Sequence, residues 1–241
     1  MIPRVLGLLC LAAASASADT LPQAIADKFG AKCLNGQPPP YELQLNESST
    51  KWVLFLEGGG WCYGLDSNST MSSCAGRAGG VWPPKAPARG WGEAAAPTSL
   101  GSGAGADIGG VMSQDCSLNP DFCTWNKLFM HYCDGASFGG GRTEPIAIST
   151  HAGAPAQMWM RGRNNFNAII SYFLTNSSLG MAKATDVILS GGSAGGLAVF
   201  YNLDHLATLL PKTTRLVGFP DAGFFIVSLP WRFLRGPAQR S

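Results

Sequence analysis

Short apolar runs alternate with longer segments of helical periodicity along this chain. An uninterrupted apolar run bounded by turn residues is typical of a buried strand. Such runs predict strands at residues 51–56, 128–132, 186–190 and 215–219. Residues 161–174 carry apolar side chains at the spacing of one helix face, and residues 197–210 form a helical stretch that ends before Pro211. Strands that alternate with helices predict an α/β fold with a mainly parallel sheet flanked by helices.

Two segments fall outside this alternation. Residues 5–14 form a short apolar run, and an A-x-A-like sequence follows at residues 16–18. We expect residues 1–18 to be a signal peptide, because the run is too short to span a bilayer and lies before a cleavage-site pattern. No membrane span is expected after its removal. Residues 76–110 are rich in glycine, proline and alanine, which predicts an irregular excursion.

Composition narrows the class of protein. The 241 residues are 46% hydrophobic and only 13% charged, and the net charge is +2 from 17 basic and 15 acidic side chains. Ordinary globular proteins are about 25% charged, so the low value is consistent with a buried parallel sheet. A nucleic-acid-binding protein would need a basic surplus gathered on one face, and none is available here. The apolar fraction is also too high for a disordered chain.

Six cysteines follow the predicted signal peptide. An even number in an exported chain favours three disulfides. Free buried thiols or a zinc site are the alternatives, but there is no C-x-x-C pair and the histidines show no ligand spacing, so no metal site is expected. The nearest neighbours in sequence, Cys62 with Cys74 and Cys116 with Cys123, are the expected local pairs. The disulfide candidates are Cys33, Cys62, Cys74, Cys116, Cys123 and Cys133.

Three N-x-S/T triplets give weak further support for export. They are glycosylation acceptors if the export route is eukaryotic. We therefore expect a secreted, extracellular protein with carbohydrate at one or more of Asn46, Asn68 and Asn176.

Two serines occur in G-x-S-x-G patterns, which are typical of the nucleophile turn of serine hydrolases. Ser193 follows an apolar strand and precedes a predicted helix, which is the context that this turn needs. Ser137 is followed by three further glycines, which cannot open a stable helix. We therefore predict that Ser193 is the nucleophile and that Ser137 lies in a glycine-rich turn.

A serine nucleophile also needs backbone N–H donors for the oxyanion of its tetrahedral intermediate. In hydrolases with this turn, one donor belongs to the residue after the serine, here Ala194. Other donors come from a glycine-rich loop that follows an early strand. Residues 58–60 are three glycines directly after the strand predicted at residues 51–56, so the sequence provides both parts.

At this point the chain resembles the pectin acetylesterase family, which also includes the Notum-type carboxylesterases. The matching blocks extend over residues 33–225, and they look more like the pectin acetylesterases than like Notum. The blocks are residues 51–62, 119–122 with Trp125 and Asn126, 132–138, 161–162, 190–198 and 221–225.

The resemblance implies a secreted serine esterase that removes acetyl groups from pectin or a related extracellular polysaccharide without a cofactor. Ser193 would form the acyl-enzyme, and Gly59, Gly60 and Ala194 would match the oxyanion-hole positions. A histidine oriented by an aspartate would act as the base, but in this family both follow the block that ends at residue 225.

None of the three histidines of the chain fits the role of that base. His205 lies 12 residues after Ser193, inside the predicted helix that leads away from the site, and we interpret it as a helix-surface residue. His131 and His151 precede the serine and break the Ser-acid-His order of this fold; we interpret them as a strand residue and a loop residue. The triad acid and histidine are therefore expected to be absent from this chain, which predicts impaired activity.

The chain is therefore expected to comprise a signal peptide at residues 1–18, the N-terminal part of the hydrolase domain at residues 19–225, and a non-matching tail at residues 226–241. One alternative function is a non-catalytic, secreted carbohydrate-binding protein, since Trp61, Trp82, Trp91 and Trp159 could stack on sugar rings. The other is a lipid-ester carboxylesterase of Notum type, which would need a large apolar pocket.

Overall fold

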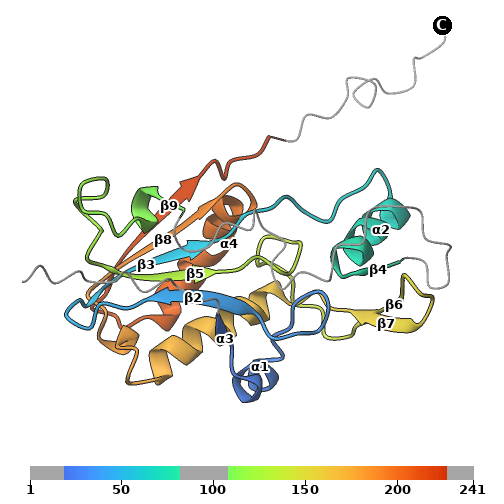
Figure 1. Ribbon diagram of the computed structural model, residues 1–241, viewed down its shortest axis with the longest axis horizontal. Coiled ribbons are helices and arrows are strands. Elements are labelled where there is room, and N and C mark those ends of the chain that lie inside the picture. The colour runs from blue at the N-terminus through green and yellow to red at the C-terminus, as the bar shows by residue number, and fades with distance from the viewer. Residues whose placement is uncertain (1–18, 82–107, 227–241) are drawn as a thin grey trace, which may run out of the picture.

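A mostly parallel sheet forms the centre of the protein. In the computed structural model, which describes residues 19–81 and 108–226, the sheet has the order β1-β2-β5-β3-β8-β9 (Figure 1). Strands β5, β3, β8 and β9 run parallel, and β2 and β1 add antiparallel strands at one edge. The bounds are β1 Asp19–Thr20, β2 Pro40–Gln44, β3 Lys51–Leu56, β5 Asn126–Met130, β8 Asp186–Gly192 and β9 Arg215–Asp221.

The two faces of this sheet are covered differently. Helices α3 (Gly162–Thr175) and α4 (Ala194–Leu209) cover one face, and α1 (Gln23–Phe29) packs on α3. Because successive side chains of a strand point to opposite faces, Trp52, Leu54 and Leu56 pack into the core beneath these helices. Val53 and Phe55 of the same strand pack instead with the 3-10 helix η1 (Gly110–Met112) and the segment that follows it.

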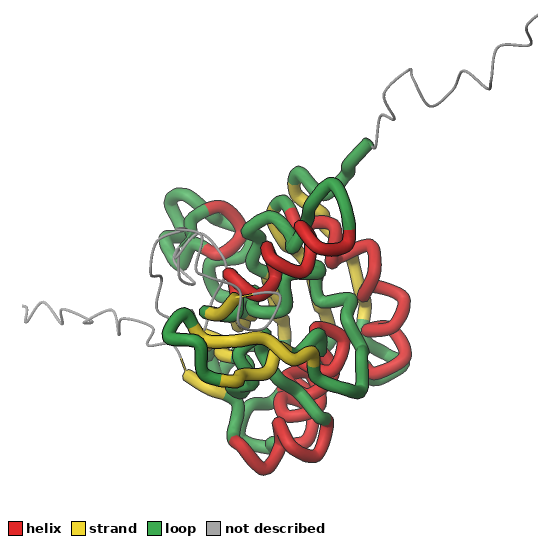
Figure 2. The backbone as a smooth tube through the Cα atoms, turned by 90° about the vertical axis from the view of Figure 1, so that its right-hand side faces the viewer, coloured by secondary structure: helices red, strands yellow, loops and turns green. Residues whose placement is uncertain are grey.

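A smaller unit lies beyond the central sheet, at the right of Figure 1, and Figure 2 views the molecule from that end. It consists of helix α2 (Ser67–Arg77) and the antiparallel sheet β4-β6-β7. Cys74 and Ala75 of α2 pack with Ile148 and Met158 of the small sheet. The strands are β4 Gly80–Val81, β6 Ile146–Thr150 and β7 Pro155–Met158, and the short helix η2 spans Met181–Lys183.

The predicted α/β fold with a mainly parallel sheet is confirmed. Every strand and helix predicted from the hydrophobic pattern is present, with shifts of a few residues at their ends. One boundary was wrong: β5 ends at Met130, so His131 and Tyr132 lie in the segment after the strand and His131 is not a strand residue.

Part of the sequence prediction lies outside the described residues. This applies to the signal peptide, to the tail after Ile226, and to Trp82 and Trp91. It also applies to most of the excursion expected at residues 76–110, whose described ends contain the last turn of α2, strand β4 and the start of η1. In the described ranges, no helix has the length and apolar character needed to cross a membrane.

The six cysteines within the described residues all form disulfides. The two local pairs expected from the sequence, Cys62–Cys74 and Cys116–Cys123, are present. The remaining pair, Cys33–Cys133, joins residues 100 positions apart. The Cys62–Cys74 disulfide joins the end of the glycine-rich segment after β3 to α2. The small unit is therefore covalently attached to the segment in which oxyanion donors were expected.

Candidate active site

Ser193 lies at a sharp turn between β8 and α4. Its backbone has φ 55° and ψ −118°, which a residue with a Cβ atom adopts only when its surroundings enforce it. The side chain is exposed and makes no capping hydrogen bond to the helix. The backbone N–H donates to the carbonyl of Asp221 at the end of β9, over 3.0 Å. The strand-turn-helix context expected for a nucleophile is therefore present at Ser193.

The glycines of the G-x-S-x-G pattern are sterically required at this turn. A Cβ atom on Gly191 would lie 2.5 Å from the carbonyl oxygen of Gly195 and 2.7 Å from that of Leu56. A Cβ atom on Gly195 would collide with the same Leu56 carbonyl. The turn therefore packs directly on the end of β3, from which the glycine-rich loop begins.

The glycine-rich loop (residues 58–61) contacts the serine turn. A Cβ atom on Gly58 would collide with the carbonyl oxygen of Gly192 and would lie 3.2 Å from Cβ of Ser193. Gly60 has φ 70°, a conformation that favours glycine. Ala194 is the first residue of α4 and is buried, and an N–H in the first turn of a helix has no acceptor within that helix. The predicted nucleophile and oxyanion-hole segments are thus brought together.

Both carbonyl groups in the middle of the glycine-rich loop accept hydrogen bonds from other elements. Arg77 of α2 donates from Nη2 to the carbonyl of Gly59 over 3.0 Å, and the Tyr132 hydroxyl donates to the carbonyl of Gly60 over 2.8 Å. In a planar trans peptide the N–H points away from the carbonyl oxygen. The N–H groups of Gly60 and Trp61 therefore point away from Arg77 and Tyr132 respectively.

Ser137, the other serine in a G-x-S-x-G pattern, is buried. It lies in a turn that no helix follows, and its exposed fraction is 1%. Its Oγ accepts a hydrogen bond of 2.6 Å from the indole Nε1–H of Trp61. A buried hydroxyl engaged in this way is unavailable to a substrate, which agrees with the prediction that Ser137 lies in a glycine-rich turn.

The three histidines lie apart from the Ser193 turn. Both ring nitrogens of His131 contact carboxylates: Nδ1 lies 3.2 Å from Glu57 Oε2, and Nε2 lies 3.0 Å from Glu42 Oε1. His131 follows β5, which is separated from β8 by β3, so about 10 Å of sheet lies between His131 and the serine strand. His151 lies in the exposed turn between β6 and β7, as expected of a loop residue.

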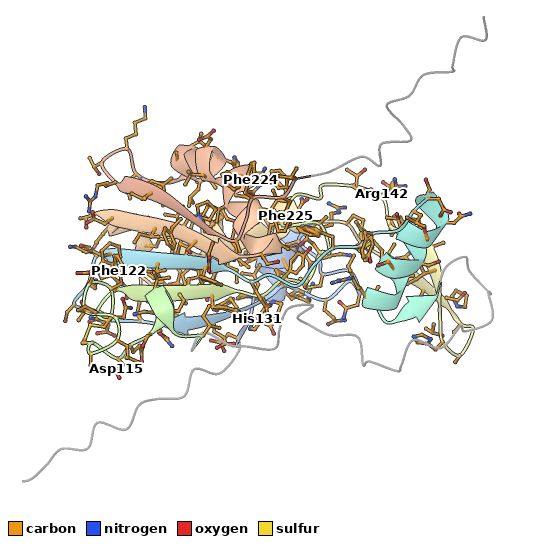
Figure 3. The ribbon with its side chains drawn as sticks, turned by 90° about the horizontal axis from the view of Figure 1, so that it is seen from above. Asp115, Phe122, His131, Arg142, Phe224 and Phe225 are labelled. Atoms are coloured by element: carbon orange, nitrogen blue, oxygen red, sulfur yellow. A yellow bond between two sulfur atoms is a disulfide. The ribbon has the colours of Figure 1, made fainter. Side chains whose placement is uncertain are left out.

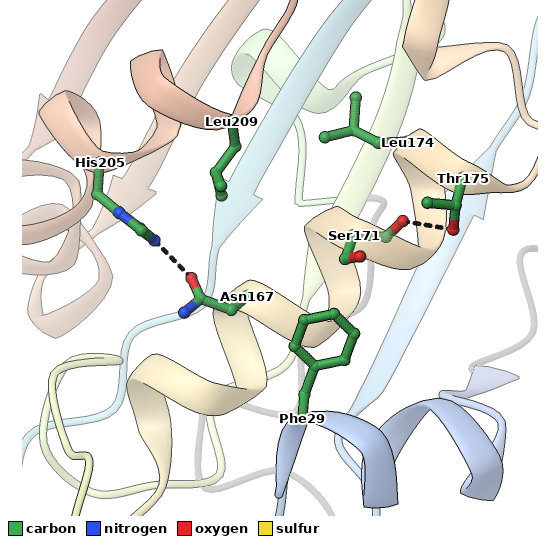
Figure 4. A pocket seen from close by; sticks show the side chains of 7 residues that line it. All are labelled: Phe29, Asn167, Ser171, Leu174, Thr175, His205 and Leu209. Atoms are coloured by element: carbon green, nitrogen blue, oxygen red, sulfur yellow. Dashed lines mark hydrogen bonds between the residues drawn. The ribbon is translucent and has the colours of Figure 1, made fainter.

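His205 lies on α4, 12 residues after the serine. Twelve residues of α4 correspond to about 18 Å, and Nε2 of His205 lies 2.7 Å from Asn167 Oδ1 on α3. The histidine was expected on the helix surface; it is half-buried and lines a cleft of about 260 Å³ between α3 and α4 (Figure 4). Burial lowers its pKa, with a smaller contribution from the positive charge of Arg163.

Asp134 is a buried carboxyl group close to the glycine-rich loop and to the start of α3. Its exposed fraction is 1%, and burial raises its pKa to about 6, although the backbone N–H of Phe138 donates to Oδ1 over 3.2 Å. A Cβ atom on Gly162 would collide with Oδ2. We interpret Asp134 as a packing residue at the helix start, because its Oδ2 atom lies against Gly162 and its Oδ1 atom accepts a hydrogen bond from Phe138.

Sequence reasoning missed several residues that surround the candidate site. Tyr132 and Asp134 belong to a block that carries the family resemblance, but nothing in that block indicates their contacts. The pairing of His131 with Glu57 and Glu42 joins segments more than 70 residues apart, and Arg77 comes from a helix that was not predicted. None of these residues has a local sequence signal.

Aromatic side chains border the glycine-rich loop. Trp61 is half-buried, and its ring lies 4.6 Å from that of Phe225 in an edge-to-face arrangement. Figure 3 shows Phe224 and Phe225 together where the described chain continues past β9, and Phe224 is 79% exposed. Trp159, another stacking candidate, packs against the ammonium group of Lys32 at 3.8 Å. Trp61 is therefore the described tryptophan best placed to face a ligand at Ser193.

The three glycosylation candidates differ in their surroundings. Asn68 is exposed at the start of α2. Asn176 accepts hydrogen bonds from Ser178 through its Oδ1 atom only. Asn46 donates from Nδ2 to the carbonyl of Thr124 over 2.7 Å. Because carbohydrate is attached through Nδ2, modification of Asn46 would disturb this hydrogen bond.

Comparisons with known proteins agree on one family. The sequence profile described as "Pectinacetylesterase" matches residues 13–231. The chain is 34% identical over 223 residues to pectin acetylesterase 5 and 31% identical over 230 residues to pectin acetylesterase 11, both of Arabidopsis thaliana. It is 26% identical over 212 residues to the palmitoleoyl-protein carboxylesterase NOTUM of Drosophila melanogaster.

These matches cover most of this chain but less of each relative. They include 90%, 92% and 83% of the chain, against 44%, 49% and 27% of the three relatives. The chain thus spans about half the length of the pectin acetylesterases that it matches.

Proposed function

Since the chain belongs to the pectinacetylesterase family, we propose that it is a serine carboxylesterase that removes acetyl groups from pectin or a related extracellular polysaccharide. The observation that carries this proposal is the contact between the Ser193 turn and the glycine-rich loop, because a serine nucleophile needs backbone donors close to it. No cofactor is needed for this reaction. Three disulfides support export to an oxidising compartment.

The reaction would proceed through an acyl-enzyme. Ser193 Oγ attacks the acetyl carbonyl and loses its proton to a base, and the N–H groups of Gly60 and Ala194 donate to the oxyanion. The polysaccharide hydroxyl then leaves with a proton, and water releases acetate from the serine. We infer that these 241 residues alone turn over slowly, because neither His131 nor His205 is placed to act as the base.

An acetyl ester is favoured over a long acyl chain as the substrate. The identity to the Arabidopsis pectin acetylesterases, 31–34%, exceeds that to the Notum proteins, 25–28%. In addition, the cleft between α3 and α4 is about 18 Å along α4 from Ser193, so it is not an acyl pocket for this serine.

The test compares the parent chain with Ser193→Ala and with Ser177→Ala, a matched change at an exposed serine. Acetate release is measured from acetylated pectin, and nitrophenol release from 4-nitrophenyl acetate and 4-nitrophenyl palmitate. We expect slow acetate release, at most about 10³–10⁴-fold over water. Only the part of it that proceeds through an acyl-enzyme is lost in Ser193→Ala, and Ser177→Ala keeps all of it. Faster nitrophenol release from the palmitate ester than from the acetate ester would favour the Notum-type alternative.

Serine reactivity is measured separately, because it does not require deacylation. The chain is incubated with a 4-nitrophenyl alkylphosphonate, and the adduct is located by peptide mass spectrometry. We expect the adduct on Ser193. Equal acetate release and equal labelling in the parent chain and Ser193→Ala would show that the esterase proposal is wrong.

A non-catalytic carbohydrate-binding role is the second candidate, favoured by the aromatic pair of Phe225 and Trp61, the latter on the loop that contacts the Ser193 turn. It predicts that pectin oligosaccharides bind to Ser193→Ala as well as to the parent chain, without hydrolysis by either. Calorimetric titration of both proteins distinguishes it from the esterase.

A further inference from the structure

The orientation of the glycine-rich loop depends on side chains that the esterase mechanism itself does not use. The Tyr132 hydroxyl donates to the carbonyl of Gly60, and because the next N–H lies on the opposite edge of the same peptide, this bond determines where the N–H of Trp61 points. Tyr132 is completely buried, and burial raises the pKa of its hydroxyl far above the usual range, so it stays a donor at any physiological pH.

Tyr132 and Ser137 act on the loop as a connected pair. The Tyr132 hydroxyl accepts the backbone N–H of Ser137 over 3.1 Å while it donates to Gly60 over 2.8 Å. Ser137 Oγ accepts the indole N–H of Trp61 over 2.6 Å. The hydrogen bonds therefore form a closed ring from Tyr132 to the Gly60–Trp61 peptide, to Ser137 and back to Tyr132.

The backbone at Ser137 is strained in a way that serves this ring. Ser137 and Phe138 have φ values of 52° and 54°, and two consecutive non-glycine residues in this region are costly unless the surroundings enforce them. The turn presents the N–H of Ser137 to the Tyr132 hydroxyl and the hydroxyl of Ser137 to the Trp61 indole. The backbone N–H of Phe138 is in turn bonded to the buried Asp134.

We propose that Tyr132 and Ser137 are positioning residues for the glycine-rich loop of the esterase site, which carries the Gly60 oxyanion donor. This inference rests on the proposed function and extends it: the buried G-x-S-x-G serine orients the glycine-rich loop for the exposed one. Neither residue touches the substrate. Their loss allows the Gly60–Trp61 peptide to rotate. Because this peptide is joined at the Gly60 Cα atom to the peptide that carries the Gly60 N–H, that donor is then no longer held in a fixed direction.

The first test removes only the Tyr132 hydroxyl. In Tyr132→Phe the ring stays and continues to pack on Phe138, whose ring centroid lies 5.7 Å away. The matched control is Tyr41→Phe, a change at a buried tyrosine of β2 that packs edge-to-face on Phe173 and does not touch the loop. The second test is Ser137→Ala, which removes the acceptor of the Trp61 indole.

Two readouts are compared, each at the same number of degrees below the thermal unfolding midpoint of the variant. The first is the rate constant for phosphonylation of Ser193, which depends on oxyanion donors; we expect it to fall by about 10–100-fold in Tyr132→Phe and to stay within twofold in Tyr41→Phe. The second is amide hydrogen exchange followed by NMR. We expect faster exchange at the N–H of Gly60 and Trp61 in Tyr132→Phe, and faster exchange of the Trp61 indole N–H in Ser137→Ala.

The outcomes separate this inference from the proposed function. If the parent chain shows no Ser193-dependent reactivity, the esterase proposal fails, and the exchange data still decide whether Tyr132 and Ser137 order the loop. If Tyr132→Phe matches Tyr41→Phe in exchange at Gly60 and Trp61, the positioning role is wrong. Faster exchange in the loop without a change in Ser193 phosphonylation would also overturn it, since the residues would then serve structure alone.

Discussion

The buried histidine between two carboxylates makes the pH dependence of stability predictable. His131 is 7% exposed, and its two ring nitrogens lie 3.2 Å from Glu57 and 3.0 Å from Glu42. Burial disfavours the imidazolium form, but the hydrogen bond to Glu57 and the charges of Glu57 and Glu42 outweigh burial and raise the pKa of His131. The ring of Phe129 lies 5.0 Å from that of His131. The folded state therefore binds a proton at pH values where the unfolded chain has released it.

The sign follows from this difference in bound protons. A group whose pKa is raised by folding stabilises the protein fully below its unfolded pKa, near 6.5 for histidine. That stability is lost as the pH rises through the higher folded pKa. The slope contributed by one proton is at most about 1.4 kcal/mol per pH unit. His131 should therefore make the free energy of unfolding decrease between pH 6.5 and the raised pKa.

The change that tests this is His131→Gln. It leaves Glu57 and Glu42 in the same buried site without their cation, and removal of one partner from a buried ion pair costs about 3–5 kcal/mol. We expect a loss of this size near pH 6.5. The loss should be smaller at pH 8.5, because the unfolded parent chain has then released its proton and the parent has lost stability accordingly. The matched control His151→Gln changes an exposed turn residue and should cost less than about 0.5 kcal/mol.

The assay is urea unfolding followed by tryptophan fluorescence, at pH 6.5, 7.5 and 8.5. A His131→Gln loss as small as that of His151→Gln at every pH would refute the buried ion-pair interpretation. So would a loss that grows as the pH rises. The double variant Glu42→Gln with His131→Gln should recover part of the stability, because only one of the two glutamates then stays charged.

Three further predictions concern the reactivity of Ser193 and the stability of the fold. Gly58→Ala places a methyl group against Ser193 and should lower its phosphonylation rate by about 100-fold, whereas Gly141→Ala, where a Cβ meets nothing within 4 Å, should leave it unchanged. Asp134→Asn should abolish a loss of stability of about 3 kcal/mol that the parent shows as the pH rises from about 4 to 6, because the folded pKa of about 6 exceeds the model-peptide value of 3.8; urea unfolding at both pH values measures it. Arg215→Ala removes an exposed ion pair and should cost less than about 1 kcal/mol in the same assay.

The fold could be predicted where burial leaves a pattern in the sequence. Strands β3 and β8 are paired on both sides and buried on both faces, so they appear as apolar runs that are easily recognised. Helix α2 could not be found in this way, because its sequence is mostly polar and carries no apolar stripe. It depends instead on the capping box at Asp66 and Ser69 and on the disulfide of Cys74. Such features stabilise a helix without leaving a periodic signal.

The candidate site has one part that the local sequence predicts and another that it does not. Its local part, Ser193 in a turn between a strand and a helix, is encoded by neighbouring residues, and the sequence separates Ser193 from Ser137 because a helix follows only the first. Its distant part is the set of contacts that orient the glycine-rich loop, which bring Arg77 and Tyr132 to carbonyls 18 and 72 residues away. Contacts over such separations depend on the finished fold, so a single sequence does not reveal them.

The two G-x-S-x-G patterns therefore have opposite consequences from the same local chemistry. Glycines on either side let a serine adopt a positive φ at both positions, with values of 55° and 52°. At Ser193 the turn lies at the carboxyl end of the sheet and exposes the hydroxyl. At Ser137 the turn is covered, so the hydroxyl must find a partner inside the protein, and it finds the Trp61 indole. The pattern supplies the strained turn, and burial decides whether its hydroxyl faces a substrate or the glycine-rich loop.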